Sequence, residues 1–153
     1  MKKLKPIAFS LLFILLATAC SPKSGNTGAG TNAHSATQAQ ETAAQTSAEQ
    51  WLALVDAGNY PDSWKTSAAL FQAAVTQDQW SQAVSAVRKP LGDLVARKLK
   101  SAQYTKTVPG APDGEYVILQ FDTSFANKKE AVETVTPKLE TDGTWKVSGY
   151  YIK

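Results

Sequence analysis

The stretch PGAPDGEYVILQFDTS, residues 109–124, decides the fold of this chain. Its opening residues, two prolines and two glycines with an aspartate among them, are typical of a turn. Over residues 115–124, apolar side chains then alternate onto both faces: Val117, Leu119 and Phe121 on one, Tyr116 and Ile118 on the other. Because both faces are largely apolar, we predict a central strand of a sheet that is partly covered on each side.

The residues around this stretch show the same alternation. Residues 95–108 precede the turn as one predicted strand, and residues 131–140 and 145–152 follow as two more. Asp142 and Gly143 form a hairpin-turn dipeptide between the last two. The second half of the chain therefore predicts a four-stranded antiparallel meander.

Apolar residues in the preceding part recur at helical spacing. One segment begins with the capping-box pattern Ser47-Ala48-Glu49-Gln50 and ends at Gly58. Two more stripes follow: Trp64, Ala68, Phe71 and Val75, then Trp80, Val84, Val87 and Leu91. We expect three helices, with a turn at residues 59–62 and with Pro90 ending the third helix near Lys89.

Helices followed by antiparallel strands indicate the α+β class. Helices packed on the concave face of a curved four-stranded sheet would bury every apolar stripe. This cone-like arrangement is similar to the nuclear transport factor two-like and cystatin-like folds.

Several stretches of the domain have sequences that are specific enough to indicate a family. They are WLALVDAGNY at 51–60, RKPLG at 88–92, PGAPDGEY at 109–116, FDTSFA at 121–126 and WKVSGYY at 145–151. Together they resemble an uncharacterised bacterial family catalogued as a domain of unknown function (four-zero-one-nine), over about residues 47–153. The family has no assigned activity, so the resemblance implies no chemistry.

The N-terminus has the three parts of an export signal. Basic residues lie within positions 1–5, an apolar core covers residues 7–16, and small residues occupy positions 17–19. As a helix, the apolar core is roughly 15 Å long, about half of a bilayer's hydrocarbon core. We therefore predict a signal peptide over residues 1–19 rather than a membrane anchor.

Leu16-Ala17-Thr18-Ala19-Cys20 resembles the lipobox of bacterial lipoproteins. The resemblance implies cleavage before Cys20, a diacylglycerol on its sulfur, and a further acyl chain such as palmitate on the new amino group. Two or three acyl chains hold a protein stably on a membrane. Ser21, where aspartate would favour the inner membrane, implies the outer membrane facing the periplasm if the cell is diderm. The alternative is an ordinary secretory signal.

Residues 20–46 are predicted to be a lipidated cysteine and a flexible tether. Residues 21–46 contain no Leu, Ile, Val, Met, Phe, Tyr or Trp, and such a composition buries too little apolar surface to offset ordering entropy. Residues 41–45 have a helix-forming composition that could extend the first helix backwards. The globular domain is assigned to residues 47–153.

Charge and composition exclude several classes of function. Three of the 16 basic residues lie in the export signal, and the remaining 13 equal the 13 acidic residues, so no basic surplus is left for nucleic acid. One cysteine and one histidine predict neither a disulfide framework nor a metal centre, and no motif indicates a cofactor.

Arg97 and Glu133 are the charged residues most in need of explanation. Strand alternation points Arg97 inward with Val95 and Leu99, and points Glu133 inward with Val135 and Leu139. Because a buried charge is unfavourable unless it is paired, we predict an ion pair between them. Asp56 lies at a helix C-terminus, where the dipole disfavours negative charge, and this favours a partner such as Arg88 or Arg97.

The alternative is a polar pocket, as in ketosteroid isomerase-like members of the superfamily that the fold resembles. Such an enzyme needs a carboxylate base, from Asp56, Asp122 or Glu133, and a tyrosine donor, Tyr116 or Tyr150, facing one cavity. The four tryptophans likewise fit either a packed core or the lining of a ligand cavity.

These observations predict a non-enzymatic, membrane-anchored envelope lipoprotein. Its membrane contact is the lipid on Cys20, and its domain binds an envelope protein or a small ligand. The alternative is a small cavity enzyme of the isomerase or cyclase type.

Overall fold

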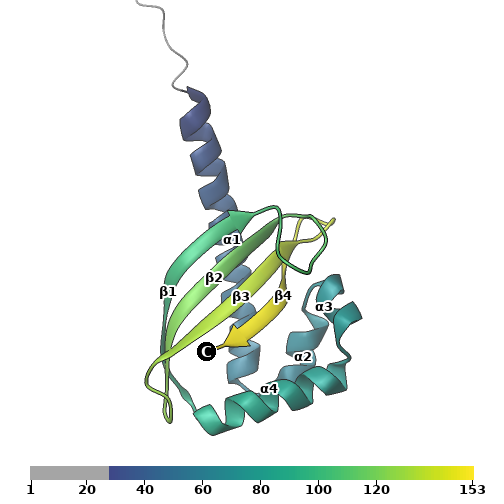
Figure 1. The fold of residues 1–153 in the computed structure, drawn as a ribbon, viewed down its shortest axis with the longest axis vertical. Helices are drawn as coiled ribbons and strands as arrows, with labels where there is room; N and C mark the ends of the chain where they lie inside the picture. Colours follow the sequence, from purple (N-terminus) through teal and green to yellow (C-terminus); the bar gives the residue numbers. More distant parts are fainter. Residues whose placement is uncertain (1–27) are drawn as a thin grey trace, which may run out of the picture.

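The computed structural model describes residues 28–153 (Figure 1). Helices come first: α1 (Gly28–Asp56), α2 (Tyr60–Lys65), α3 (Ala69–Ala74) and α4 (Gln77–Leu91). Strands follow: β1 (Leu94–Thr105), β2 (Tyr116–Phe125), β3 (Ala131–Leu139) and β4 (Trp145–Ile152). This order confirms the predicted α+β class. None of the helices among the described residues is long and apolar enough to span a membrane.

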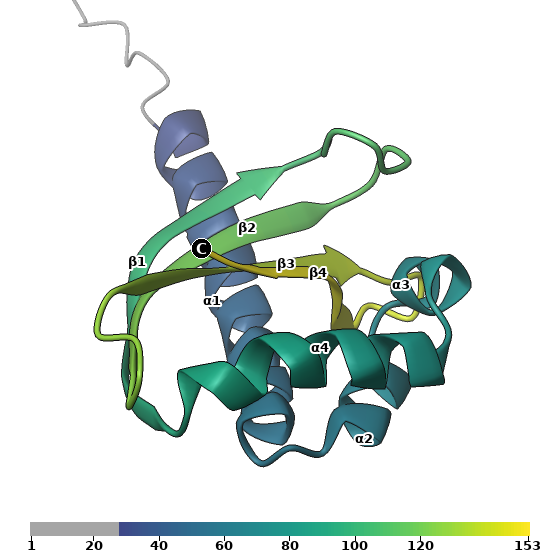
Figure 2. The ribbon, with the colours of Figure 1, turned by 60° about the horizontal axis from the view of Figure 1, so that its bottom comes forward.

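The strands form one antiparallel meander in the order β1-β2-β3-β4. The interior position of β2 confirms the prediction, and Tyr116, Val117, Leu119 and Phe121 on its two faces are all buried. α1 crosses one face of the curved sheet and contacts all four strands (Figure 1). α2, α3 and α4 gather at one end of the sheet, with α4 along α2 (Figure 2).

The apolar core lies between α1, α4 and the sheet. Trp51, Leu52 and Val55 of α1 are buried against Trp80 and Val84 of α4. The sheet adds buried side chains from three strands: Val117, Leu119, Phe121, Val135 and Val147. The apolar residues of the predicted helices and strands thus meet in one core. One residue is an exception: Val87, predicted on the apolar stripe of the third helix, is 49% exposed, and Arg88 is buried beside Trp80 and Val84 instead.

The structure corrects the predicted start of the first helix. α1 begins at Gly28, so residues 28–46 are helical where a flexible tether was predicted. From Gln40 onward this part of α1 is held by the rest of the domain: Ala44 is fully buried, the Gln40 amide donates to Glu115 (3.1 Å), and Glu41 accepts from a backbone N–H of β1 (3.0 Å). The rest of the predicted tether and the predicted signal peptide lie outside the described residues.

The predicted N-cap at Ser47 is also wrong. Ser47 lies in the interior of α1, and its hydroxyl donates to the carbonyl of Trp145 (2.6 Å). The same pattern at Thr76 does begin α4: Thr76 and Gln79 form a reciprocal capping box. Pro90 lies in the last turn of α4, so the helix continues to Leu91, past the end predicted near Lys89.

The predicted helix through Trp64 and Val75 is divided into α2 and α3, and α2 begins within the predicted turn. The link between them is held by tertiary partners. The Ala68 N–H donates to the Val147 carbonyl of β4 (2.8 Å), and the Trp51 indole N–H donates to the Ser67 hydroxyl (2.9 Å). The Ala68 N–H thus donates to β4 and not to a carbonyl one helical turn earlier, and the spacing of apolar residues does not indicate such a distant partner.

Candidate functional site

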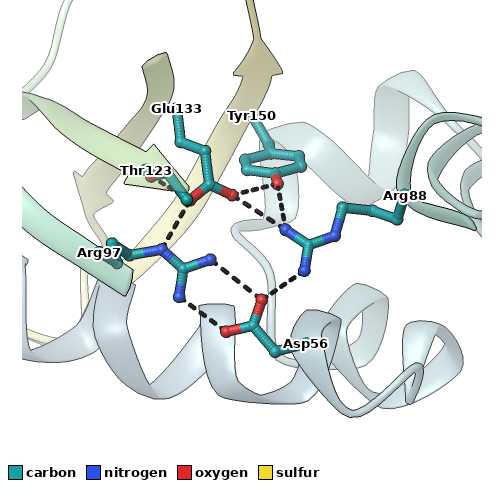
Figure 3. A network of polar contacts seen from close by, with 6 residues as sticks. All are labelled: Asp56, Arg88, Arg97, Thr123, Glu133 and Tyr150. Atoms are coloured by element: carbon teal, nitrogen blue, oxygen red, sulfur yellow. Dashed lines mark hydrogen bonds and ion pairs between the residues drawn. The ribbon is translucent and has the colours of Figure 1, made fainter. Parts of the chain in front are cut away.

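Six polar side chains meet in the core, one from α1, one from α4 and one from each strand (Figure 3). They are Asp56, Arg88, Arg97, Thr123, Glu133 and Tyr150. We call this set the six-residue network. Its charged members are withdrawn from water: the exposed side-chain fraction is 0% for Glu133, 5% for Arg88, 12% for Arg97 and 19% for Asp56.

Glu133 is the centre of the six-residue network. Its Oε1 accepts from the Tyr150 hydroxyl (2.6 Å) and from Arg88 Nη1 (3.1 Å). Its Oε2 accepts from Arg97 Nε (2.6 Å) and from the Thr123 hydroxyl (2.8 Å). A carboxylate offers about four lone-pair sites, so Glu133 has a donor for each one. This saturation is what makes a fully buried carboxylate tolerable.

Asp56, at the end of α1, is the second carboxylate of the six-residue network and contacts both arginines. Arg97 contacts it in bidentate fashion, Nη1 to Oδ2 at 2.7 Å and Nη2 to Oδ1 at 3.0 Å. Arg88 Nη2 lies 2.6 Å from Asp56 Oδ1, and its guanidinium also lies 4.5 Å from the centre of the Phe125 ring. Each arginine therefore bridges both carboxylates, and the formal charges sum to zero.

The pKa values of two members are shifted in directions that preserve this charge pattern. For Arg97, burial alone would lower the pKa, but hydrogen bonds and charges from Asp56 and Glu133 outweigh it and raise the pKa above its ordinary value. For Tyr150, burial raises the pKa of the phenol, and the charge of Glu133 and the hydrogen bond to it raise it further. Arg97 therefore stays cationic and Tyr150 stays a donor.

This raised Tyr150 pKa predicts a stability loss at alkaline pH. Because the folded-state pKa lies above the unfolded value near 10, the contribution of the neutral phenol is fully present below about pH 10 and is lost as pH rises further. Urea unfolding above about pH 10 should show the wild type losing up to about 1.4 kcal/mol per pH unit more than Tyr150→Phe. Equal slopes for the two proteins would contradict the assignment.

The structure brings together three of the four residues predicted for a pocket or buried ion pair. Asp56, Arg97 and Glu133 are in direct contact. Tyr116 is not with them: it is buried elsewhere, and its hydroxyl donates to the carbonyl of Pro112 (2.7 Å) in the turn before β2. Cys20, the predicted lipidation site, lies outside the described residues.

Sequence reasoning missed Thr123 and underrated Arg88. Arg88 follows Trp80 and Val84 at a spacing of four on the buried stripe of α4, and this spacing was the available signal. Thr123 shares its strand face with Phe121 and lies opposite Arg97 in the β1–β2 register. Only the register, which depends on the bulges in β1, reveals the second relation.

The aromatic residues beside the six-residue network pack against one another. Trp51 contacts Trp80 and Tyr150, with ring centres 5.6 Å and 5.3 Å apart. The indole N–H of Trp51 donates to the Ser63 carbonyl (2.7 Å), and that of Trp80 donates to the Ser63 hydroxyl (2.9 Å). Their polar atoms are thus satisfied within the protein, as a packed core requires.

Surface depressions reach the six-residue network at several places. One of about 560 Å³ has Arg97 and Thr123 in its lining, and Tyr150 lines a smaller one between α4 and β4. Another, of about 310 Å³, reaches Asp56 and Arg88, with Tyr60 and Asp93 also in its lining. No buried side-chain nitrogen or oxygen among the described residues lacks a hydrogen-bond partner. Within residues 28–153, no group of three or more His, Cys, Asp or Glu side chains is placed to hold a metal ion.

Comparison with known proteins places the domain but assigns it no activity. No curated protein and no solved structure matches the chain significantly. A family model described as "Protein of unknown function (DUF4019)" matches residues 47–150, which include all six residues of the network. The chain therefore belongs to this family of proteins of unknown function.

Proposed function

We propose that this chain is a lipid-anchored envelope protein whose folded domain acts by binding another molecule and not by catalysis. One observation carries the second part: both carboxylate oxygens of Glu133 are saturated by donors of the protein itself. A general base or acid needs an unoccupied position facing its substrate. Glu133 instead accepts from four neighbouring side chains, and the Tyr150 hydroxyl donates to Glu133.

The placement of the six-residue network supports a joining role. Its members come from α1, α4 and every strand, so it ties the helical layer to the whole sheet. The isomerase-type alternative needs a carboxylate and a tyrosine facing one cavity. Here Tyr150 and Glu133 face each other at 2.6 Å, with their polar atoms directed inward.

The anchoring part of the proposal comes from residues 16–20, with their lipobox pattern. The shape of α1 is compatible with it. This helix is 29 residues long, about 43 Å at the usual rise, and its first part projects beyond the sheet (Figure 1). Six of the seven residues from 33 to 39 are exposed, so α1 would act as a spacer between lipid and domain.

Cys20→Ser is expected to abolish lipid attachment, because a serine hydroxyl does not replace the thiol in diacylglycerol transfer. Cells labelled with palmitate should show label on the wild type and none on the variant, which should accumulate as an unprocessed precursor. Ser21→Ala, which leaves residues 16–20 intact, is the matched control and should be labelled normally. Processing and membrane retention of Cys20→Ser at wild-type levels would refute the anchor.

A further inference from the structure

β4 is an edge strand whose outer side is partly unpaired. Lys153 and Val132 of β3 exchange two backbone hydrogen bonds (2.9 and 3.0 Å), so the peptide groups of Lys153 point toward β3. In an antiparallel ladder this direction alternates, and the N–H and C=O groups of Ile152 and Tyr150 therefore point away from the sheet. Among the described residues, no other element hydrogen-bonds to those groups.

The unpaired stretch has a defined end. Further back along the same edge, the carbonyl of Val147 accepts from the Ala68 N–H in the α2–α3 link (2.8 Å). The β3–β4 register also shifts between Thr136 and Pro137. The free edge is therefore short and centred on residues 150–152.

An apolar groove of about 210 Å³ runs beside this free edge, between β4 and α4. Its lining includes Trp80, Val84 and Val87 of α4 and Tyr151 and Ile152 of β4, and it contains no charged side chain. Val87 is 49% exposed and Tyr151 is 61% exposed, two of the three large apolar side chains with such exposure among the described residues. Unpaired peptide groups and an apolar groove thus lie side by side.

The opposite edge of the sheet is protected. β1 carries Lys98 and Lys100, contains two register shifts, and has its Tyr104 N–H bonded to Glu41 of α1 (3.0 Å). Charges, bulges and a covering helix are the usual devices that keep an edge strand from pairing with other chains. The free edge of β4 has none of these over residues 150–152.

We propose that the β4 edge binds an extended segment of a partner protein, which adds a fifth strand and places alternate apolar side chains in the groove. The proposal rests on the proposed binding function and names its site. A second copy of this chain fits less well, because a stable dimer buries about 800 Å² per partner and this edge is only a few residues long. Lys153, directly after the free edge, favours an acidic residue at that end of the segment.

The test uses peptides selected from a random-peptide phage library on the full mature chain in detergent micelles. We expect the selected peptides to alternate apolar residues and to slow amide hydrogen exchange at Tyr150 and Ile152. Ile152→Pro removes the outward N–H without breaking the β3–β4 ladder and should weaken binding roughly tenfold relative to Ile152→Ala, which keeps it. Val87→Lys should also weaken binding, whereas Val95→Lys, at a comparably exposed site on β1, should not.

Every other outcome would contradict the proposal that the β4 edge is the binding site. Peptides that bind but protect amides elsewhere, or that ignore Ile152→Pro and Val87→Lys, place binding on another surface and leave the proposed function standing. Failure to select any peptide, with exchange at Tyr150 and Ile152 unchanged, rules out strand addition. Protection that rises with protein concentration alone assigns the edge to a second copy. A different result would contradict the proposed function: a catalytic activity of the wild type that a folded Glu133 variant has lost.

Discussion

Glu133→Gln is expected to lower the free energy of unfolding by about 3–5 kcal/mol, because breaking a buried ion pair leaves its partners uncompensated. Glutamine keeps the size of the side chain but removes the charge that Arg88 and Arg97 share. Its amide group is also a donor, facing neighbours that all donate to Glu133 in the wild type. Since domains are stable by only about 5–15 kcal/mol in total, the loss is a large fraction.

This expected loss is the cost of removing one partner, and it differs from the net contribution of the whole network. Taking two arginines and two carboxylates out of water carries a desolvation penalty that their mutual attraction only roughly offsets. The six-residue network thus contributes little net stability. Its main effect is to fix the relative positions of α1, α4 and the sheet.

Urea unfolding monitored by tryptophan fluorescence checks the prediction. The matched control is Asp122→Asn, which breaks the half-exposed Lys100–Asp122 pair (2.9 Å) and should cost at most about 1 kcal/mol. A Glu133→Gln variant with the same urea midpoint as the wild type would contradict the structural role of Glu133. If that folded variant also lost ligand binding, Glu133 would be part of a binding or catalytic pocket.

The sequence predicts those parts of the six-residue network that follow from local periodicity. Strand alternation is a property of the backbone, so the inward directions of Arg97 and Glu133 could be predicted without the fold. The same alternation was wrong for Val95, which is 60% exposed because the β1–β2 register shifts between Leu94 and Ala96. The helix dipole likewise indicated that Asp56 needs a cation. What could not be predicted is how closely α4 approaches the sheet, and this decides whether Arg88 reaches Glu133.

The start of α1 could not be predicted for a related reason. Residues 33–46 are Ala, Ser, Thr, Gln and similar residues without an apolar stripe, and a short isolated helix of this kind is marginal in water. Its docking depends on Ala44, whose small side chain is buried, and on Gln40 and Glu41, whose partners lie more than 60 positions away. Composition alone therefore indicated a tether.

Trp51→Ala is expected to cost about 3–5 kcal/mol, the usual range for deleting a large aromatic side chain from a core. Trp51 is 3% exposed and lies at the junction of α1, the α2–α3 link and the network. Its removal would leave the Ser63 carbonyl without the indole donor (2.7 Å) and would take away the ring that contacts Tyr150 (5.3 Å). Cavity formation and lost hydrogen bonds therefore act in the same direction.

Trp51→Phe separates these two contributions, because phenylalanine keeps much of the ring and lacks the N–H. We expect it to cost about 1–3 kcal/mol of the free energy of unfolding. The control Tyr151→Ala, at a site 61% exposed, should cost less than about 0.5 kcal/mol.

Because Trp51 and Tyr150 are in contact, the double variant Trp51→Phe with Tyr150→Phe should depart from additivity by about 0.5 kcal/mol or more in urea unfolding. Strict additivity would mean that the aromatic cluster and the network stabilise the fold independently, and that the indole of Trp51 does not position the phenol that donates to Glu133.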